Sequence, residues 1–272
     1  MDVPLEALLD FVLLATIAIG LVMIMTGAWA IQRATSSSGW IDTIWSFAVG
    51  LGGIVAAVFA HGDGGRRIAA FVIIAVWSLR LSLHIAGRTK GADEDPRYAK
   101  LIEEWGPSAS LRLWLFLQLQ AMAAFILVLA VYLAAANPVA FPRVLDLLAI
   151  AVAVIAIGGE AMSDRQLAAF RKAPEAKTGV MEAGLWRYSR HPNYFFEWLG
   201  WCAWPLLAIT VPLGWSWLSL LAPMLMYWLL VHVSGIPPLE HHMLASRGDK
   251  FRALQTRVNA FFPGPRKGES PT

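Results

Sequence analysis

The sequence predicts an all-α, polytopic membrane protein with seven transmembrane helices, and three observations support this prediction. Hydrophobic residues make up 57 % of the 272 residues and charged residues only 15 %, whereas an ordinary soluble domain has about 25 % charged residues. Seven apolar runs approach the length of about 20 residues that a helix needs to cross a bilayer. The Lys and Arg residues gather in alternate connections between these runs.

The seven runs are expected to be helices, because a bilayer offers no hydrogen-bond partner to an unpaired backbone group. The turn at residues 211–215 is so short that the last two runs should form an antiparallel pair. The runs comprise residues 8–31, 40–60, 68–86, 113–135, 145–162, 194–211 and 215–234.

The charge distribution predicts the orientation of the chain. If the amino terminus lies outside, 18 of the 22 Lys and Arg residues fall in cytoplasmic segments and three in external ones, and the remaining cation, Arg80, lies within a run. Cytoplasmic connections of membrane proteins carry such an excess. We therefore expect an external amino terminus and a cytoplasmic carboxy terminus, and the net charge of +3 indicates topology and not a nucleic-acid partner.

Three further segments complete the prediction outside the membrane. Residues 93–106 are typical of a short amphipathic helix, and residues 238–260 alternate apolar and charged residues as a helix along the membrane interface would. Residues 1–263 are predicted to form a single membrane domain, followed by a disordered tail at 264–272. The single cysteine, Cys202, excludes an intrachain disulfide, and no metal site is expected.

Polar residues within the runs mark a candidate cavity in the amino-terminal half. Asp42 lies near the start of the second run, and Arg80 and His84, four residues apart, share a face of the third. Ionisable groups at membrane depth are costly and usually face a cavity or a partner. Two interpretations stay open: an Asp42–Arg80 pair that only packs two helices together, or a role at a substrate or cofactor cavity.

The densest polar chemistry lies at residues 160–197. Glu160, Asp164 and Arg171 are spaced by four and seven residues, so a continuing helix presents them along one stripe. Cations at residues 187–191 precede Pro192, which suits the start of a helix, and the amide and acid of Asn193 and Glu197 follow. Arg side chains bind phosphate oxygens with paired donors. A basic loop that only sets topology explains the cations, but not the acids and the amide.

These residues carry a resemblance to known membrane enzymes. Residues 188–194, Tyr-Ser-Arg-His-Pro-Asn-Tyr, followed by Glu197, resemble the signature of the steroid 5α-reductase-like membrane proteins. They are also similar to the sterol C=C reductases and to the isoprenylcysteine and phospholipid methyltransferases. The resemblance is strong from Asp164 to Glu197. It extends over nearly the whole chain through residues 42–45, 77–81 and 94–98.

The resemblance implies a reductase that uses NADPH, with the cofactor in residues 145–263 and the substrate in the amino-terminal half. In this family hydride goes to the β-carbon of an enone while an acidic pair polarises the 3-oxo group. The chain departs from the family at that pair, so the catalytic groups are expected among Asp42, Arg80 and Tyr98. The positions implied for the cofactor are Glu160, Asp164, Leu167, Arg171, Tyr188, His191, Asn193, Glu197 and Glu240.

The expected reaction is reduction of the C=C bond of a 3-oxo-4-ene steroid or a similar lipophilic enone. Its substrate would enter from the lipid of a bacterial inner membrane, and the cofactor site would face the cytoplasm. Two alternatives stay open: an S-adenosylmethionine-dependent methyltransferase of a lipid or isoprenylated thiol, and a lipid-binding or transport protein. The helix from Asp164 to Arg171 favours the longer, phosphate-bearing cofactor.

Overall fold

The computed structural model describes residues 5–90, 95–210 and 214–267, and within these ranges the regular structure is helical, without strands. Six helices among the described residues are long and apolar enough to cross a membrane, so the chain is a multi-pass integral membrane protein. Its contacts divide it into two units. The first unit comprises Met1–Leu147 and Trp204–Ala222, and the second comprises Leu148–Ala203 and Pro223–Thr272.

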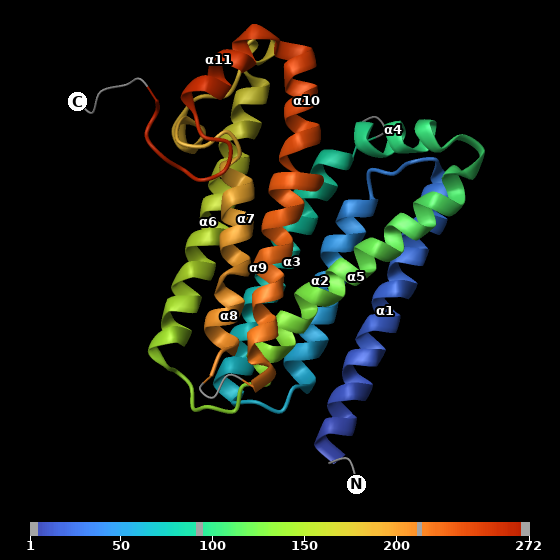
Figure 1. Cartoon of the computed structure of the whole chain (residues 1–272), viewed down its shortest axis with the longest axis vertical. Helices are drawn as coiled ribbons and strands as arrows, with labels where there is room; N and C mark the ends of the chain where they lie inside the picture. The colour runs from blue at the N-terminus through green and yellow to red at the C-terminus, as the bar shows by residue number, and fades with distance from the viewer. Residues whose placement is uncertain (1–4, 91–94, 211–213, 268–272) are drawn as a thin grey trace. The chain divides into compact units, whose positions relative to one another are not determined.

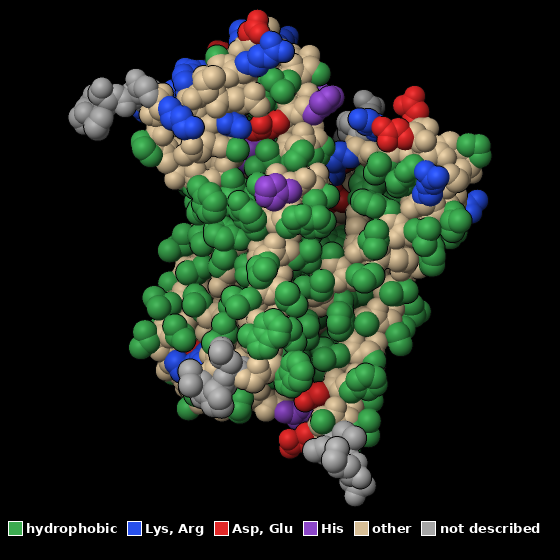
Figure 2. All heavy atoms as spheres, in the orientation of Figure 1, with side chains coloured by type: hydrophobic (Ala, Val, Ile, Leu, Met, Phe, Trp, Pro, Cys, Tyr) green, Lys and Arg blue, Asp and Glu red, His purple; other side chains and the backbone are tan. Residues whose placement is uncertain are grey.

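Long apolar helices that pack side by side form the first unit (Figure 1). They are α1 (Leu5–Thr35), α2 (Ile41–Phe59), α3 (Gly64–Thr89) and α5 (Ala109–Ala135). On the face shown in Figure 2, hydrophobic side chains cover the middle of the helices and charged side chains lie near their ends, as lipid requires. The shorter helices of this unit are α4 (Pro96–Trp105), η1 (Gly106–Ser108), α8 (Ala203–Ala208) and η4 (Gly214–Leu220).

Small residues bring α2 close to α3. A Cβ atom on Gly50 would lie 1.9 Å from the Oγ of Ser78, and one on Gly53 would lie 2.6 Å from a side-chain carbon of Ile74. The Ser78 hydroxyl donates a hydrogen bond of 3.0 Å to the carbonyl oxygen of Ser46 on α2. Close backbone approach through small residues is a common way for helices to associate in lipid. It fixes α2, which carries Asp42, against α3.

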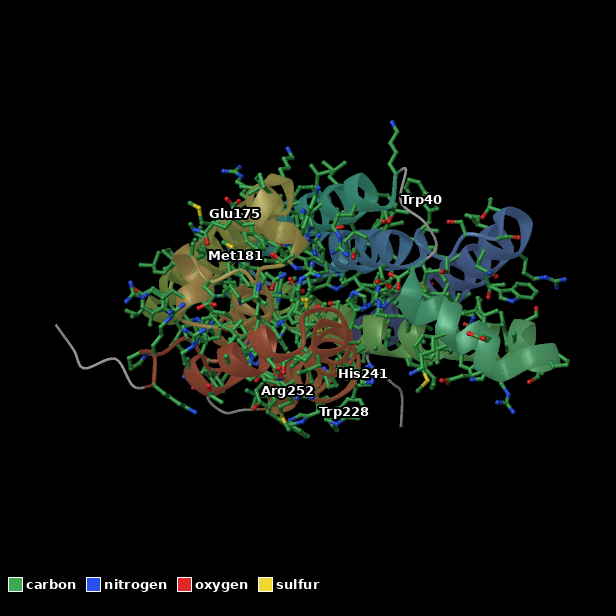
Figure 3. All side chains as sticks on the ribbon, turned by 90° about the horizontal axis from the view of Figure 1, so that it is seen from above. Trp40, Glu175, Met181, Trp228, His241 and Arg252 are labelled. Carbon is green, nitrogen blue, oxygen red and sulfur yellow. The ribbon has the colours of Figure 1, made fainter. Side chains whose placement is uncertain are left out.

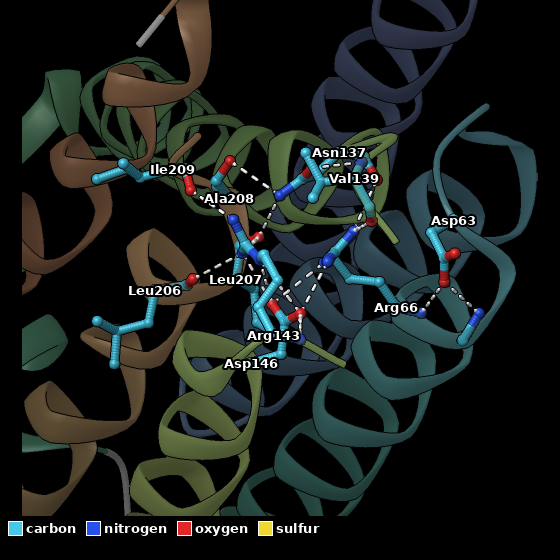
Figure 4. A network of polar contacts seen from close by, with 11 residues as sticks. Asp63, Arg66, Asn137, Val139, Arg143, Asp146, Leu206, Leu207, Ala208 and Ile209 are labelled. Atoms are coloured by element: carbon cyan, nitrogen blue, oxygen red, sulfur yellow. Dashed lines mark hydrogen bonds and ion pairs between the residues drawn. The ribbon is translucent and has the colours of Figure 1, made fainter. Parts of the chain in front are cut away.

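A buried ionic network connects α3 with the start of α6 (Val144–Lys172) (Figure 4). The guanidinium of Arg66 is fully buried and lies 2.7 Å from the carboxylate of Asp146. Arg143 contacts the same carboxylate at 2.8 Å. Arg66 counts as an external loop cation in the predicted topology, but the structure places it within α3, because Asp146 and nearby carbonyl groups satisfy its charge and its N–H groups.

The same network holds the end of α8. The last carbonyl groups of a helix have no partner within it. Arg143 donates to the carbonyl oxygens of Leu206, Leu207 and Ile209, and the amide nitrogen of Asn137 donates to that of Leu207 at 2.9 Å. The six-residue α8 therefore ends on side chains from distant parts of the chain.

The second unit contains most of α6, α7 (Pro192–Trp201) and α9 (Leu221–Trp228). The predicted sixth run, 194–211, is not one long helix, since α7 ends at Trp201 and α8 begins at Ala203. Each of the other six predicted runs falls within a long apolar helical stretch, and for the last run this stretch, Gly214–Arg247, consists of several consecutive helical elements. The turn predicted at 211–213 lies outside the described residues. The remaining elements are η2 (Pro174–Lys177), η3 (Gly184–Arg187), the π-helix η5 (Leu229–Val233), α10 (Ile236–Arg247) and α11 (Asp249–Arg257).

The carboxy-terminal segment packs within the second unit. The predicted helix at 238–260 is two helices, because Gly248 between them has a φ of 53°, which ends α10. Phe251 and Leu254 of α11 are buried with Val258. In the stretch predicted to be disordered, the backbone N–H of Gly264 donates to Tyr188 and that of Lys267 to Arg257. Residues 268–272 lie outside the described residues.

Candidate functional site

Helices α6 and α7 bring together several of the predicted cofactor residues. The amide nitrogen of Asn193 on α7 lies 3.3 Å from a carboxylate oxygen of Asp164 on α6. Glu160, one turn before Asp164, is 5 % exposed, and Asp164 is 8 % exposed. Glu197 is also buried, and its carboxylate accepts a hydrogen bond of 2.9 Å from the indole of Trp201. The helical spacing seen in the sequence thus places acids and an amide between two packed helices.

The segment between these helices is anchored to α6. The side-chain oxygen of Gln166 accepts a 3.0 Å hydrogen bond from the backbone N–H of Leu185. The indole of Trp186 donates to the carbonyl oxygen of Ser163 at 3.1 Å. Gly184 has a φ of 61°, and a Cβ atom there would overlap the side chain of Gln166 at 2.5 Å, so this position requires glycine. Gln166 and Trp186 were not among the predicted site residues, because their roles depend on how the loop folds back.

Glu240, on α10, connects the segment before α7 with α11. Its carboxylate lies 2.7 Å from Nε of Arg190 and 2.9 Å from Nε2 of His191. Gln255 of α11 donates to the same carboxylate at 2.7 Å. The side chains of Arg190 and Glu240 are 10 % and 13 % exposed, so the ion pair is largely protected from water. The structure brings together Glu240 and His191, two of the residues predicted for the cofactor, and adds Arg190, which was not predicted.

His191 has a defined tautomer in this arrangement. Burial lowers the pKa of His191, and the hydrogen bond and charge of Glu240 offset this effect only in part. The neutral ring must carry its proton on Nε2 to donate to Glu240, which leaves Nδ1 as an acceptor. Nδ1 is buried and has no hydrogen-bond partner among the described residues. The ring stacks on that of Tyr194, with centroids 5.6 Å apart.

The other predicted cofactor residues lie at the edge of this set. Leu167 is half-buried on α6, and Arg171 is exposed in the last turn of the same helix. Tyr188 is 48 % exposed, and its carbonyl oxygen holds the backbone of Gly264. Each of these residues belongs to the second unit, so the predicted cofactor residues share one unit.

A second polar cluster lies in the first unit around Asp42. The phenol of Tyr98 on α4 donates a 2.9 Å hydrogen bond to Asp42, and the side-chain nitrogen of Gln120 on α5 lies 3.0 Å from the phenol oxygen. The guanidinium of Arg97 pairs with the same carboxylate. The structure thus brings Asp42 and Tyr98 together and shows Arg97 as a charge partner of Asp42. Arg80 is half-buried on α3.

The hydrogen-bond donors and acceptors of the cluster around Asp42 can be assigned. A phenol has one O–H group, and Tyr98 donates it in a hydrogen bond to Asp42. The phenol oxygen must therefore accept a hydrogen bond from the amide nitrogen of Gln120. The side-chain oxygen of Gln120 is then left over, and it is buried without a hydrogen-bond partner among the described residues. The backbone carbonyl oxygen of Gln120, by contrast, accepts a 2.9 Å hydrogen bond from the indole of Trp45. Sequence spacing gave no signal for Gln120.

Asp95 orients Arg97 toward this cluster. Its carboxylate accepts hydrogen bonds from the backbone N–H of Arg97 at 2.9 Å and from its guanidinium at 2.8 Å. Burial raises the pKa of Asp95, but the hydrogen bonds and charge of Arg97 outweigh this effect, so the pKa lies below its ordinary value. Asp95 therefore stays ionised and caps α4. Glu94, which belongs to the resembling segment 94–98, lies outside the described residues.

Comparison with known proteins places the whole arrangement in a family. The model of a family described as proteins of unknown function (DUF1295) matches residues 28–258. The chain belongs to this family. The match begins within α1 and ends just after α11, so it includes both polar clusters. No curated protein and no solved structure matches the chain.

Proposed function

We propose that this protein uses NADPH to reduce the C=C bond of a lipophilic enone, such as a 3-oxo-4-ene steroid. The observation that carries the proposal is the buried Asp164–Asn193 contact between α6 and α7, beside Glu160 and Glu197. Carboxylates and an amide at this depth suit the hydroxyl groups of a cofactor better than contact with lipid. The resemblance of residues 188–197 to the steroid 5α-reductase-like proteins supports the same cofactor.

The second unit contains the groups that a dinucleotide needs. Its phosphates need cations, which Arg171 and its neighbours at the end of α6 supply. Its ribose hydroxyls need acceptors, and Asp164 and Nδ1 of His191 can accept. Asn193 offers both an N–H donor and a carbonyl acceptor. Bound NADPH would supply the hydride, and the protein would supply the binding and orientation.

In this proposal the first unit supplies the proton donor. The side chain of Tyr98 is buried, and the N–H of Gln120 donates to its oxygen, which strengthens the phenol as a donor. Tyr98 turns its O–H from Asp42 to the carbonyl oxygen of the enone, and Arg97 keeps the Asp42 carboxylate in place meanwhile. Arg80, on α3, is a further candidate for the carbonyl end of the substrate.

We further propose that the chain crosses a bacterial inner membrane seven times. The pair α7 and α8 together would make the sixth crossing, and the amino terminus would lie outside. The bias of 18 against three cations outside the predicted runs supports this orientation, and it remains when Arg66 and Arg67, which lie in the first turn of α3, are left out. Substrate would then enter from the bilayer and NADPH from the cytoplasm.

Titration of the purified protein in detergent with NADPH, NADH and S-adenosylmethionine tests the proposal. We expect saturable binding of NADPH, none of S-adenosylmethionine, and consumption of NADPH when an enone is added. Asn193→Ala and Arg171→Ala should weaken NADPH binding. Arg165→Gln, which removes an exposed cation from the same helix, should leave it unchanged.

The same titration separates the alternatives. Binding of S-adenosylmethionine alone would indicate a lipid or isoprenylcysteine methyltransferase, a class that shares the pattern at Arg190, His191, Pro192 and Tyr194. Binding of neither cofactor would favour a lipid-binding or transport protein. NADPH affinity that is the same in Arg171→Ala and the wild type would remove the assignment of the phosphates to the end of α6.

A further inference from the structure

The chain after α11 lies across the segment that precedes α7, and we call its residues 258–267 the carboxy-terminal strap. The backbone N–H of Arg190 donates a 2.9 Å hydrogen bond to the carbonyl oxygen of Asn259. In the opposite direction, the backbone N–H of Gly264 donates a 3.0 Å bond to the carbonyl oxygen of Tyr188. Donors from both segments therefore join the strap to residues 188–190.

Both ends of the strap are fixed within the second unit. At its beginning, Val258 is buried with Phe251 of α11, the helix on which Figure 3 labels Arg252. Near its other end, the guanidinium of Arg266 lies 2.8 Å from the carboxylate of Glu182. The strap is thus ordered, although it begins after the last helix of the chain.

The middle of the strap is anchored by the ring of Phe261, a residue that is 4 % exposed. The ring packs edge to face on Phe195 and Trp198 of α7, with centroids 5.9 Å and 5.7 Å away. It packs in the same way on Tyr227 of α9, at 5.4 Å. Edge-to-face contacts stabilise a pair of rings beyond the burial of their apolar area. The ring therefore holds the backbone of residues 260–261 against the second unit.

Ser189 connects this anchored backbone with His191. Ser189 is fully buried, and its hydroxyl lies 2.9 Å from the carbonyl oxygen of Phe261 and 3.2 Å from that of Ala260. The single hydroxyl hydrogen is therefore donated to the strap. The hydroxyl oxygen also accepts a 3.1 Å hydrogen bond from the backbone N–H of His191. One side chain thus links the carbonyl groups of the strap to the backbone of a predicted cofactor residue.

A second connection runs from the strap to the ring of His191. The guanidinium of Arg190 donates to the carbonyl oxygen of Val258 and lies 2.7 Å from the carboxylate of Glu240. That carboxylate lies 2.9 Å from Nε2 of His191 and sets the tautomer of the ring. The strap therefore acts on both the backbone and the side chain of His191.

We infer that Ser189 is a positioning residue, which together with the carboxy-terminal strap holds His191 so that its Nδ1 stays available to accept a hydrogen bond from a ligand. The part that concerns the ligand rests on the proposed function. Nδ1 is buried and has no hydrogen-bond partner among the described residues. Ser189→Ala takes the hydroxyl away from the N–H of His191 and from the carbonyl groups of the strap. Buried polar groups that lose a partner are costly, so the segment shifts and carries the imidazole away from Glu240.

Histidine-ring ¹⁵N NMR of the purified full chain without cofactor tests the inference, at about pH 8, where an ordinary imidazole is neutral. Loss of a resonance in His191→Gln assigns His191. The wild type should show the Nε2–H tautomer, and Ser189→Ala a larger share of Nδ1–H, with NADPH bound about tenfold more weakly, as when one hydrogen bond is lost. Ser189→Thr, which keeps the hydroxyl, should restore both. Ser246→Ala, which removes an exposed hydroxyl from α10, should match the wild type.

The outcomes separate this inference from the proposed function. A wild-type tautomer in Ser189→Ala overturns the inference, whatever its effect on stability or NADPH affinity, because a purely structural role would lower stability without moving the ring. A changed tautomer with unchanged NADPH affinity would show that His191 is positioned but does not contact the cofactor. If the wild type binds no NADPH, the proposed function is wrong, and the tautomer still decides the role of Ser189.

A second variant tests the strap itself and serves if Ser189→Ala does not fold. Phe261→Leu removes the ring that anchors the strap and keeps the hydroxyl of Ser189. We expect the tautomer of His191 to change in the same direction as in Ser189→Ala. An unchanged tautomer in Phe261→Leu would show that the strap does not position His191.

Discussion

Tyr98 holds the proton that the proposed reaction needs. Tyr98→Phe removes the phenol O–H and leaves Asp42 paired with Arg97. If Tyr98 polarises the substrate carbonyl, turnover should fall by about 10²- to 10⁴-fold, as for other general acids, and NADPH affinity should stay unchanged. Stopped-flow NADPH oxidation and equilibrium titration measure the two quantities separately.

The matched control for this variant is Tyr227→Phe, which removes a phenol O–H from the aromatic cluster of the second unit. It should keep full turnover. The role assigned to Tyr98 would be wrong if Tyr98→Phe kept its turnover or lost NADPH affinity instead.

His191 predicts how the second unit responds to acid. Because the pKa of His191 is lowered by burial, the unfolded chain takes up a proton at a higher pH than the folded protein does. The stability that this group contributes is therefore complete above its ordinary pKa of about 6.5 and is lost as the pH falls below it. The unfolding temperature of the wild type should fall more steeply between about pH 7 and pH 5 than that of His191→Gln. The glutamine can still donate to Glu240 but does not titrate.

His242→Gln is the control for this experiment, because His242 is exposed on α10. It should follow the wild type across the pH range. If the unfolding temperatures of the wild type and His191→Gln fell equally with pH, the predicted pKa effect would be absent. The charges that face the ring, Glu240 and Arg190, would then accommodate the protonated and the neutral imidazole equally well.

Residue spacing predicts which site residues share a face of one helix, whereas contacts between helices were either implied by the family resemblance alone or missed. Asp164 is placed by its spacing to Glu160 and Arg171 along α6, a local property. Arg97 as a partner of Asp42 could not be predicted, because that contact depends on how α4 docks against α2. Gln120 gave no signal for the same reason, since its role follows from Tyr98 on another helix.

At the scale of the element, Gly50 decides how closely α2 approaches α3. Gly50→Ala would place a Cβ atom 1.9 Å from the hydroxyl of Ser78, so the two helices must separate. We expect a loss of about 1–3 kcal/mol in the free energy of unfolding, the cost of overpacking, measured by thermal or chemical unfolding in detergent. Adding Ser78→Gly should recover part of the loss.

Gly20→Ala is the matched control, because a Cβ atom on Gly20 of α1 would meet nothing within 4 Å. It should leave stability unchanged. Equal stability of Gly50→Ala and Gly20→Ala would mean that the α2–α3 interface can yield, and that Gly50 is not required for close packing.

The long helices could be predicted because hydropathy is a local property of the chain. Six apolar runs are found as long helices for this reason. The end of α8 at Ala208, within the predicted sixth run, could not be predicted, since the carbonyl groups there are satisfied by Arg143 and Asn137 from elsewhere in the chain. Arg66 was misplaced for a related reason: its charge suggested a loop, while its partner Asp146 lies 80 residues away.

For the whole molecule, the proposed orientation can be mapped with thiol labelling. In a Cys202→Ser background, which removes the chain's single cysteine, Thr178→Cys and His61→Cys each introduce one exposed thiol. An impermeant maleimide added to spheroplasts should label the variant at position 61 and not the one at 178, and inside-out vesicles should give the reverse. Labelling of both from one side would contradict the orientation derived from the cations.

The Arg66–Asp146 network also has a consequence for the order in which the chain is made. Synthesis proceeds from the amino terminus, so Arg66, Asn137, Arg143 and Asp146 are all complete before α8 leaves the ribosome. The side chains that donate to the carbonyl groups of α8, Arg143 and Asn137, are therefore synthesised before it. The ion pairs of Arg66 and Arg143 with Asp146 hold this part of the network in place. A helix of six residues is too short to insert by its own hydropathy, and we expect its insertion to be guided by the part of the protein made before it.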